Sequence, residues 1–220
     1  MIDLSRRLNL FQGDCLEIMK DIPDKSIDLI LTDPPYGIGI ANKECVGGGS
    51  WRGKTKKFDI KEWDNNKINK NYFDEIFRIS KNQIVFGGNY YSDWFSSSSC
   101  WLVWYKRDGL PTRTFADCEL AWTSFNEPSR VFNFKQDGFI RDAKEKYTHP
   151  TQKPIALMEW CLNKYSKFND LVLDCFMGSG TTGVASLKLN RRFIGVELDE
   201  KYFGIAKERI GSWKGQERLL

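Results

Sequence analysis

The chain has 220 residues, of which 41% are hydrophobic and 28% are charged, and its formal net charge is +4. This length predicts one domain, and the composition is ordinary for a soluble globule. No apolar run reaches membrane-spanning length, which argues against a membrane protein, and the first residues lack the apolar core of a signal peptide. The six scattered cysteines include no CxxC and the chain has one histidine, so we expect no metal, no disulfide framework and a cytoplasmic location.

In chain order, short apolar runs alternate with segments of helical spacing. Strands are predicted over residues 8–11, 27–31, 83–86, 101–105, 119–123, 130–134, 171–173 and 192–196. Helices are predicted over residues 15–20, 72–79, 90–95, 155–165, 181–189 and 202–210. We expect a long, mobile loop between residues 37 and 63, a charged loop over 137–146 and a polar tail over 212–220.

This alternation predicts an α/β fold with a mostly parallel, twisted sheet and helices on both faces. The middle of the chain is richer in strands and loops than its two flanks. Both flanks follow the strand-to-helix pattern, and the length of the chain predicts that residues 1–220 form a single domain.

The segment Thr32-Asp33-Pro34-Pro35-Tyr36 follows the buried strand predicted over residues 27–31. Two prolines cannot donate to a sheet ladder, so the strand must end there in a stiff turn. The turn lies at the carboxyl end of a strand, where open α/β sheets bind ligands. A carboxylate, carbonyl oxygens and an aromatic ring are suited to gripping a flat base with an amino group. Taken alone, the segment is equally a strand that ends in a polar turn.

A second motif, Asp174-Cys175-Phe176-Met177-Gly178-Ser179-Gly180-Thr181-Thr182, lies between a predicted strand and a predicted helix. Glycines let the backbone approach a ligand closely, and the helix start offers free N–H groups. The lysine of a phosphate-binding loop is missing, and the glycines alone are a weak signal. Glu197 ends the next strand, about 20 residues on, where an acidic side chain binds ribose hydroxyls. The spacing therefore predicts a cofactor that carries adenosine.

With these motifs the chain resembles the amino-group DNA methyltransferases that use S-adenosylmethionine. Asp33-Pro34-Pro35-Tyr36 resembles the family's catalytic DPPY motif, and Phe176-Met177-Gly178-Ser179-Gly180 resembles its FxGxG cofactor motif. His149-Pro150-Thr151-Gln152-Lys153-Pro154 resembles the segment that precedes FxGxG. DPPY comes first here, which is the circularly permuted order of the family's β group.

The resemblance implies a Rossmann-like methyltransferase fold in which the strand at 171–173 is central. The strand at 192–196 would lie beside it, the strand at 8–11 next outward, and the DPPY strand on the other side. The catalytic residues would be Asp33, Pro34, Pro35 and Tyr36. The cofactor-binding residues would be Asp14, Cys15, Asp33, His149, Thr151, Lys153, Pro154, Asp174, Phe176, Gly178, Ser179, Gly180, Thr181, Thr182, Glu197 and Leu198. Asp14 is also a plausible helix cap, and it can serve in both ways.

The implied reaction is transfer of a methyl group to the exocyclic amine of a base flipped out of the duplex. Asp33 favours the N6 amine of adenine, because DPPY is mostly found with adenine and SPPY with cytosine. Methylation of cytosine N4, of RNA or of a protein amide, and a non-catalytic DNA-binding copy, remain alternatives.

The expected partner is double-stranded DNA, and a homodimer is a further possibility. Between residues 43 and 57 the chain carries five basic residues and one acidic residue, a local charge of +4 in a DNA-facing loop that spans about 38–63. A solvated lysine-rich loop would look the same. A short target-recognition region is expected at about 107–147. The DNA-binding candidates are Lys43, Trp51, Arg52, Lys54, Lys56, Lys57, Arg113 and Arg130.

Overall fold

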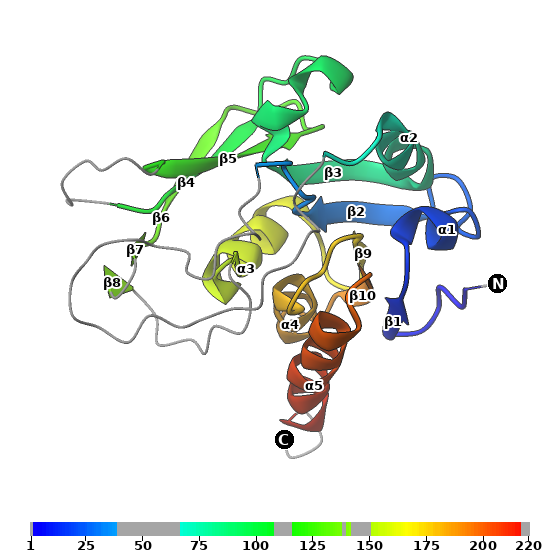
Figure 1. The fold of residues 1–220 in the computed structure, drawn as a ribbon. Helices are drawn as coiled ribbons and strands as arrows, with labels where there is room; N and C mark the ends of the chain where they lie inside the picture. Colours follow the sequence, from blue (N-terminus) through cyan, green and yellow to red (C-terminus); the bar gives the residue numbers. More distant parts are fainter. Residues whose placement is uncertain (1, 39–66, 108–115, 138–139, 142–150, 217–220) are drawn as a thin grey trace.

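The computed structural model describes residues 2–38, 67–107, 116–137, 140–141 and 151–216 (Figure 1). An eight-stranded sheet runs through this part of the chain, in the order β1-β10-β9-β2-β3-β5-β4-β6. In that order the strands are β1 (Leu8–Gln12), β10 (Arg192–Glu197), β9 (Leu171–Asp174), β2 (Ile27–Thr32), β3 (Ser80–Phe86), β5 (Cys118–Thr123), β4 (Trp101–Tyr105) and β6 (Arg130–Asn133).

The sheet is mostly parallel, as the sequence predicts. The five strands from β1 to β3 in that order pair in parallel, β5 is antiparallel to β3 and β4, and β6 is parallel to β4. The predicted neighbours are also confirmed, since β10 lies beside β9, β1 follows outward, and β2 lies on the other side of β9. Segments from the two ends of the sequence therefore meet in the middle of one sheet.

Helices cover both faces of the sheet (Figure 1). On one face lie α1 (Cys15–Met19) and α2 (Lys70–Ile79); on the other lie α3 (Ile155–Tyr165), α4 (Thr181–Lys188) and α5 (Glu200–Gln216). Alternate residues of β2 serve the two faces, because Leu29 and Leu31 pack with α3 and α4 whereas Ile30 packs with α1 and α2. Burying each such side chain contributes about 1.5–3 kcal/mol, so β2 is fixed from both sides.

The segment 90–95 differs from the single short helix that the sequence predicts. It forms two 3₁₀ turns, η2 (Gly88–Tyr90) and η3 (Ser92–Trp94). The Tyr90 and Tyr91 amides bond three residues back, to Gly87 and Gly88. Tyr91 is buried against Phe73, with ring centroids 4.9 Å apart. This aromatic packing stabilises the two 3₁₀ turns in place of a regular helix.

The predicted polar tail and the predicted charged loop contain regular structure instead. Helix α5 continues to Gln216, into the predicted polar tail, because the Trp213 side chain packs against the core and Lys188 Nζ lies 5.0 Å from its ring. Strands β7 (Gln136–Asp137) and β8 (Ile140–Arg141) pair antiparallel where a charged loop is predicted. None of the helices in the described ranges is long and apolar enough to cross a membrane.

Candidate active site

The turn after β2 is held by two tyrosines. The Tyr36 hydroxyl donates a hydrogen bond to Asp33 Oδ1, and the Tyr91 hydroxyl donates one to the Pro35 carbonyl. The Asp33 carboxylate is largely removed from water, with its side chain 24% exposed. Burial raises the pKa of Asp33, although Lys153 opposes this rise. The turn therefore presents a carboxylate in a fixed position at the carboxyl edge of the sheet.

Gly87, directly after β3, makes room for the Tyr36 ring. Its backbone has φ +66°, and a Cβ at this position would lie 2.0 Å from Tyr36 Cε1. The ring also stacks on Tyr90, with centroids 4.8 Å apart and planes 18° apart. The glycine thus lets two aromatic rings stack beside Asp33.

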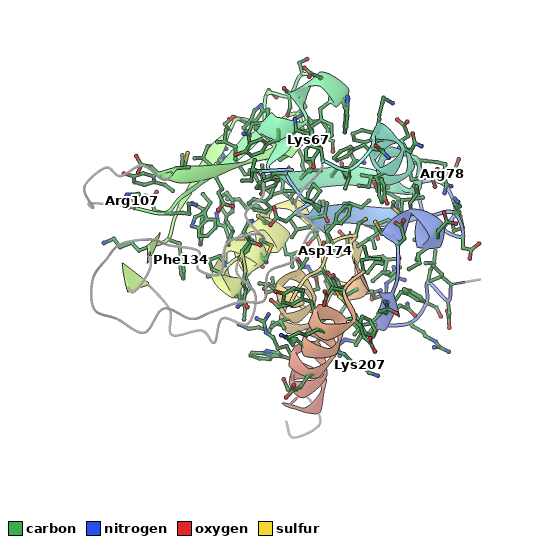
Figure 2. The ribbon with its side chains drawn as sticks, viewed as in Figure 1. Lys67, Arg78, Arg107, Phe134, Asp174 and Lys207 are labelled. Atoms are coloured by element: carbon green, nitrogen blue, oxygen red, sulfur yellow. The ribbon has the colours of Figure 1, made fainter. Side chains whose placement is uncertain are left out.

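Asp174 ends β9 and joins this strand to its neighbour β2. Thr32 Oγ1 donates to Asp174 Oδ1 at 2.8 Å, the Phe176 amide donates to the same oxygen at 3.2 Å, and the Thr182 side chain is a further donor. Figure 2 shows Asp174 near the middle of the molecule, where the ends of the central strands meet. Burial raises the pKa of Asp174 to about 6. The two motifs thus meet at one edge of the sheet, as predicted.

The glycine turn between β9 and α4 is built around Glu197. Its two carboxylate oxygens accept hydrogen bonds from the Gly178 and Asp199 amides, both at 2.8 Å. Burial raises the pKa of Glu197. Gly180 has φ +80°, and a Cβ there would approach Ala206 Cα to 3.1 Å. The Glu197 carboxylate therefore lies next to a glycine turn that packs closely on the backbone of α5.

Met177 seats this turn on the sheet. Gly195, in the middle of β10, leaves the space for it, since a Cβ at Gly195 would lie 2.4 Å from Met177 Sδ. The Met177 amide also bonds to the Val196 carbonyl at 3.0 Å. At Met177 the turn therefore packs closely on the backbone of β10, in addition to the bond between Gly178 and the Glu197 carboxylate.

Asp14 lies at the same edge, on the other side of Glu197. It caps α1, since its Oδ1 accepts from the Leu16 amide at 2.9 Å, and both of its oxygens accept from the Tyr72 hydroxyl at 3.0 Å. The Gly13 amide donates to the Glu197 carbonyl at 3.0 Å, which holds the two acidic residues close together. The predicted capping role is confirmed.

The segment before α3 connects the two motifs. Gln152 Oε1 accepts from Ser179 Oγ at 3.1 Å, whereas Lys153 Nζ contacts Asp33 Oδ2 and lies 3.0 Å from Glu119 Oε2. Burial alone would lower the pKa of Lys153, but the two carboxylates outweigh it and raise that pKa. Burial would raise the pKa of Glu119, but Lys153 and Lys106 lower it to about 2. Lys153 and Glu119 therefore carry opposite charges near neutral pH, and Lys153 lies between the carboxylates of Asp33 and Glu119.

The other predicted site residues have different surroundings. Cys15, Ser179, Thr181 and Thr182 are buried, and Leu198 is 66% exposed on the rim beside Glu197. Arg130 is exposed on β6. The predicted residues His149, Lys43, Trp51, Arg52, Lys54, Lys56, Lys57 and Arg113 lie outside the described residues. Within the described ranges, no three His, Cys, Asp or Glu side chains gather as a metal site would require.

Four residues that the sequence did not single out contact this site: Tyr72, Tyr91, Glu119 and Gln152. Gln152 lies inside a recognised motif, so its position could have drawn attention to it. Glu119 had one signal, since it is a charged residue in a predicted strand of otherwise apolar character. The two tyrosines lie in aromatic-rich segments where core packing is the ordinary expectation.

The fold and site together define an α/β protein in which a glycine turn bound to the Glu197 carboxylate lies next to an Asp-Pro-Pro-Tyr turn. A family model described as DNA methylase, N6_N4_Mtase, matches residues 104–208. The chain is 27% identical to Type II methyltransferase M2.MboI of Moraxella bovis, over 93% of this chain and 88% of the relative. It is 29% identical to Type II methyltransferase M.HinfI of Haemophilus influenzae, over 91% of this chain and 67% of the relative.

Solved structures are also similar to this chain. The crystal structure of the M1.HpyAVI–SAM complex is 28% identical and matches with a TM-score of 0.58 over 92% of this chain and 98% of the other. The cytosine-N4-specific PvuII DNA methyltransferase matches with a TM-score of 0.59 at 16% identity, over 96% of this chain and 94% of the other, which concerns the fold alone. These comparisons support an amino-group DNA methyltransferase.

Proposed function

We propose that the protein transfers the methyl group of S-adenosylmethionine to an exocyclic amine of a base in double-stranded DNA. One observation carries this proposal: the Asp33 turn and the Glu197-bound glycine turn meet at one edge, where Thr32 bonds to Asp174 at 2.8 Å. A methyl donor held by one turn and an amine held by the other would then be close together. The methyltransferase relatives support the same reaction.

The edge formed by Glu197, Asp14 and Gly178 has the chemistry of a cofactor site for this molecule. Glu197 and Asp14 are carboxylates at neighbouring strand ends, suited to ribose hydroxyls and to an adenine amine. The exposed Leu198 and the ring of Phe176 offer apolar surface next to them for a flat adenine. Bound there, S-adenosylmethionine supplies an electrophilic methyl group.

On the other side of the edge, Asp33 and the Pro34 carbonyl would accept the two N–H bonds of the target amine. The amine lone pair is delocalised into the base ring, so these acceptors must hold the nitrogen pyramidal and direct the lone pair toward the methyl group. Asp33 also offsets the positive charge that develops, and the proton can leave after transfer. Tyr36 lies beside the acceptors to stack on the flipped base.

Adenine N6 is the proposed target, and cytosine N4 is the alternative. The DPPY form favours adenine, but both amines need the same acceptors, and one structural neighbour is described as cytosine-N4-specific. The order of the motifs, with DPPY before FxGxG, favours the circularly permuted β group. Mass analysis of nucleosides from methylated DNA separates the two bases.

We further propose that DNA is contacted through the basic loop at about 38–63 and through residues 107–147, which include Arg130, as parts of a single domain. The exposed Arg130 on outer strand β6 is available for a phosphate contact. A cytoplasmic location and a possible homodimer belong to the same proposal.

Expression in a methylation-free host, followed by sequencing of its DNA with base-modification detection, tests the function directly and gives both base and site. Asp33→Ala should abolish methyl transfer while S-adenosylmethionine binding, measured by calorimetry, persists. Asp21→Ala, which changes an exposed aspartate, should retain both. Full activity of Asp33→Ala would show that another group holds the amine.

A further inference from the structure

A buried ammonium lies on the carboxylate that the target amine needs. Lys153 Nζ contacts Asp33 Oδ2, and the Tyr36 hydroxyl donates to Oδ1, so both carboxylate oxygens already have donors. The Lys153 side chain is only 7% exposed, and its Nζ lies 5.9 Å from the centre of the Tyr36 ring. The ammonium is thus an N–H donor beside the ring and the acceptor proposed for the base.

Glu119 offers this ammonium a second partner. Its Oε2 lies 3.0 Å from Lys153 Nζ, and its Oε1 accepts from Lys106 Nζ at 2.9 Å. A charge in the interior is costly when it loses its partner, so Lys153 can release Asp33 only if another carboxylate stays with it. Glu119 meets that requirement without any rearrangement of the backbone.

We propose that Lys153 occupies the position of the target amino group until the base enters, and that Glu119 is the positioning residue that then holds the ammonium. This inference rests on the proposed function. Lys106 competes for Glu119, so it sets how strongly Glu119 attracts Lys153. The group is a relay of opposite charges, Lys106–Glu119–Lys153–Asp33, that leads from β4 and β5 to the catalytic turn.

Two substitutions should shift the balance in opposite directions. Glu119→Gln removes the second carboxylate and leaves Lys153 on Asp33. The state in which Lys153 has left Asp33 is then less populated, so KM for unmethylated DNA should rise about tenfold. Lys106→Met leaves Glu119 with Lys153 as its cation, so KM for DNA should fall about threefold by the same argument. The affinity for S-adenosylmethionine should stay within about twofold in both variants.

A purely structural ion network predicts something else. Both substitutions would then lower thermal stability and kcat together, and neither would lower KM for DNA. Glu119→Asp keeps the charge, so its KM for DNA should lie between the values of the unaltered protein and of Glu119→Gln. In a Lys153→Met background, Glu119→Gln should have no further effect on KM for DNA, because the ammonium that it guides is gone.

The measurement is steady-state methyl transfer to DNA from a methylation-free host, with thermal unfolding of each variant alongside. If the unaltered protein methylates DNA but Glu119→Gln and Lys106→Met leave KM for DNA unchanged, or move it in the same direction, this inference is wrong and the proposed function stands. If the unaltered protein does not methylate DNA, the proposed function itself is wrong. If Glu119→Gln does not fold, Lys106→Met and Glu119→Asp decide the matter.

Discussion

Thr32 and Asp174 end adjacent parallel strands and bond to each other, with Thr32 Oγ1 2.8 Å from Asp174 Oδ1. Thr32 directly precedes Asp33, and Asp174 begins the segment that leads into the glycine turn. Both side chains are buried, so water does not compete for this bond. This bond therefore contributes to the spacing between the proposed amine acceptor and the proposed cofactor turn, together with the pairing of β2 and β9.

Thr32→Val tests that dependence, because valine keeps the shape of threonine and loses the hydroxyl. We expect unfolding in urea to become easier by about 1–2 kcal/mol and methyl transfer to fall about tenfold. Thr123→Val is the matched control: its buried hydroxyl donates to the Cys100 carbonyl at 2.7 Å, away from the two turns. The control should lose similar stability and keep its activity. Equal loss of activity in both variants would contradict a special role for Thr32.

Gly87→Ala should displace the Tyr36 ring, since its Cβ would lie 2.0 Å from Cε1 and its φ of +66° disfavours a side chain. We expect a loss of methyl transfer of about a hundredfold, with S-adenosylmethionine binding retained. Gly204→Ala is the control, because a Cβ at that position on α5 meets nothing within 4 Å. The control should be active and more stable by about 0.4–1 kcal/mol. An active Gly87→Ala variant would mean that the site tolerates a displaced Tyr36.

Glu197→Gln should weaken the affinity for S-adenosylmethionine about tenfold or more, because a neutral amide replaces a charged acceptor of hydroxyl hydrogen bonds. It also replaces one of the two oxygens that now accept from the Gly178 and Asp199 amides. Glu200→Gln makes the same change on the exposed first turn of α5 and should leave affinity unchanged. Titration calorimetry measures both, and equal affinities for the two variants would exclude Glu197 from the cofactor site.

Asp174 predicts a pH dependence of stability. Burial raises its pKa from 3.8 to about 6, so between these values the folded state keeps a proton that the unfolded state has released. Raising the pH through this range therefore lowers the free energy of unfolding, by about 3 kcal/mol for this group. The stability of the wild type relative to Asp174→Asn should fall by this amount between about pH 3 and about pH 7. If the free energies of unfolding of the wild type and of Asp174→Asn, measured in urea, differed by the same amount at every pH, the raised pKa of Asp174 would be wrong.

The parallel core of the fold could be predicted because each of its strands is a short apolar run with a turn at its end. Residues 171–173 are buried, and so are residues 27–31 apart from Asp28, which leaves a nearly continuous apolar pattern in the sequence. The 3₁₀ turns before β4 could not be predicted, because the choice between them and a helix depends on packing of Tyr91 against Phe73, which is distant in sequence. Helix α5 likewise continues through polar residues because Trp213 packs against the core.

The site was predictable where a motif is contiguous, as at Asp33-Pro34-Pro35-Tyr36. It was not predictable where strand pairing supplies a partner from elsewhere. Glu119 reaches Lys153 because β5 inserts antiparallel between β3 and β4, an arrangement that no local pattern in residues 118–123 indicates. Tyr72 reaches Asp14 because α2 packs on α1, which again joins two segments far apart in the sequence.

The fit of Met177 against Gly195 has a practical consequence for engineering. Efforts to make such a protein accept synthetic donors with larger alkyl groups would begin by randomising positions around the donor. Any side chain introduced at Gly195 would occupy the space that Met177 now fills. It would push the turn away from the sheet and narrow the space that a larger donor needs. If this turn holds the donor as proposed, shortening Met177 while Gly195 stays fixed would instead let the turn move toward the sheet and enlarge that space.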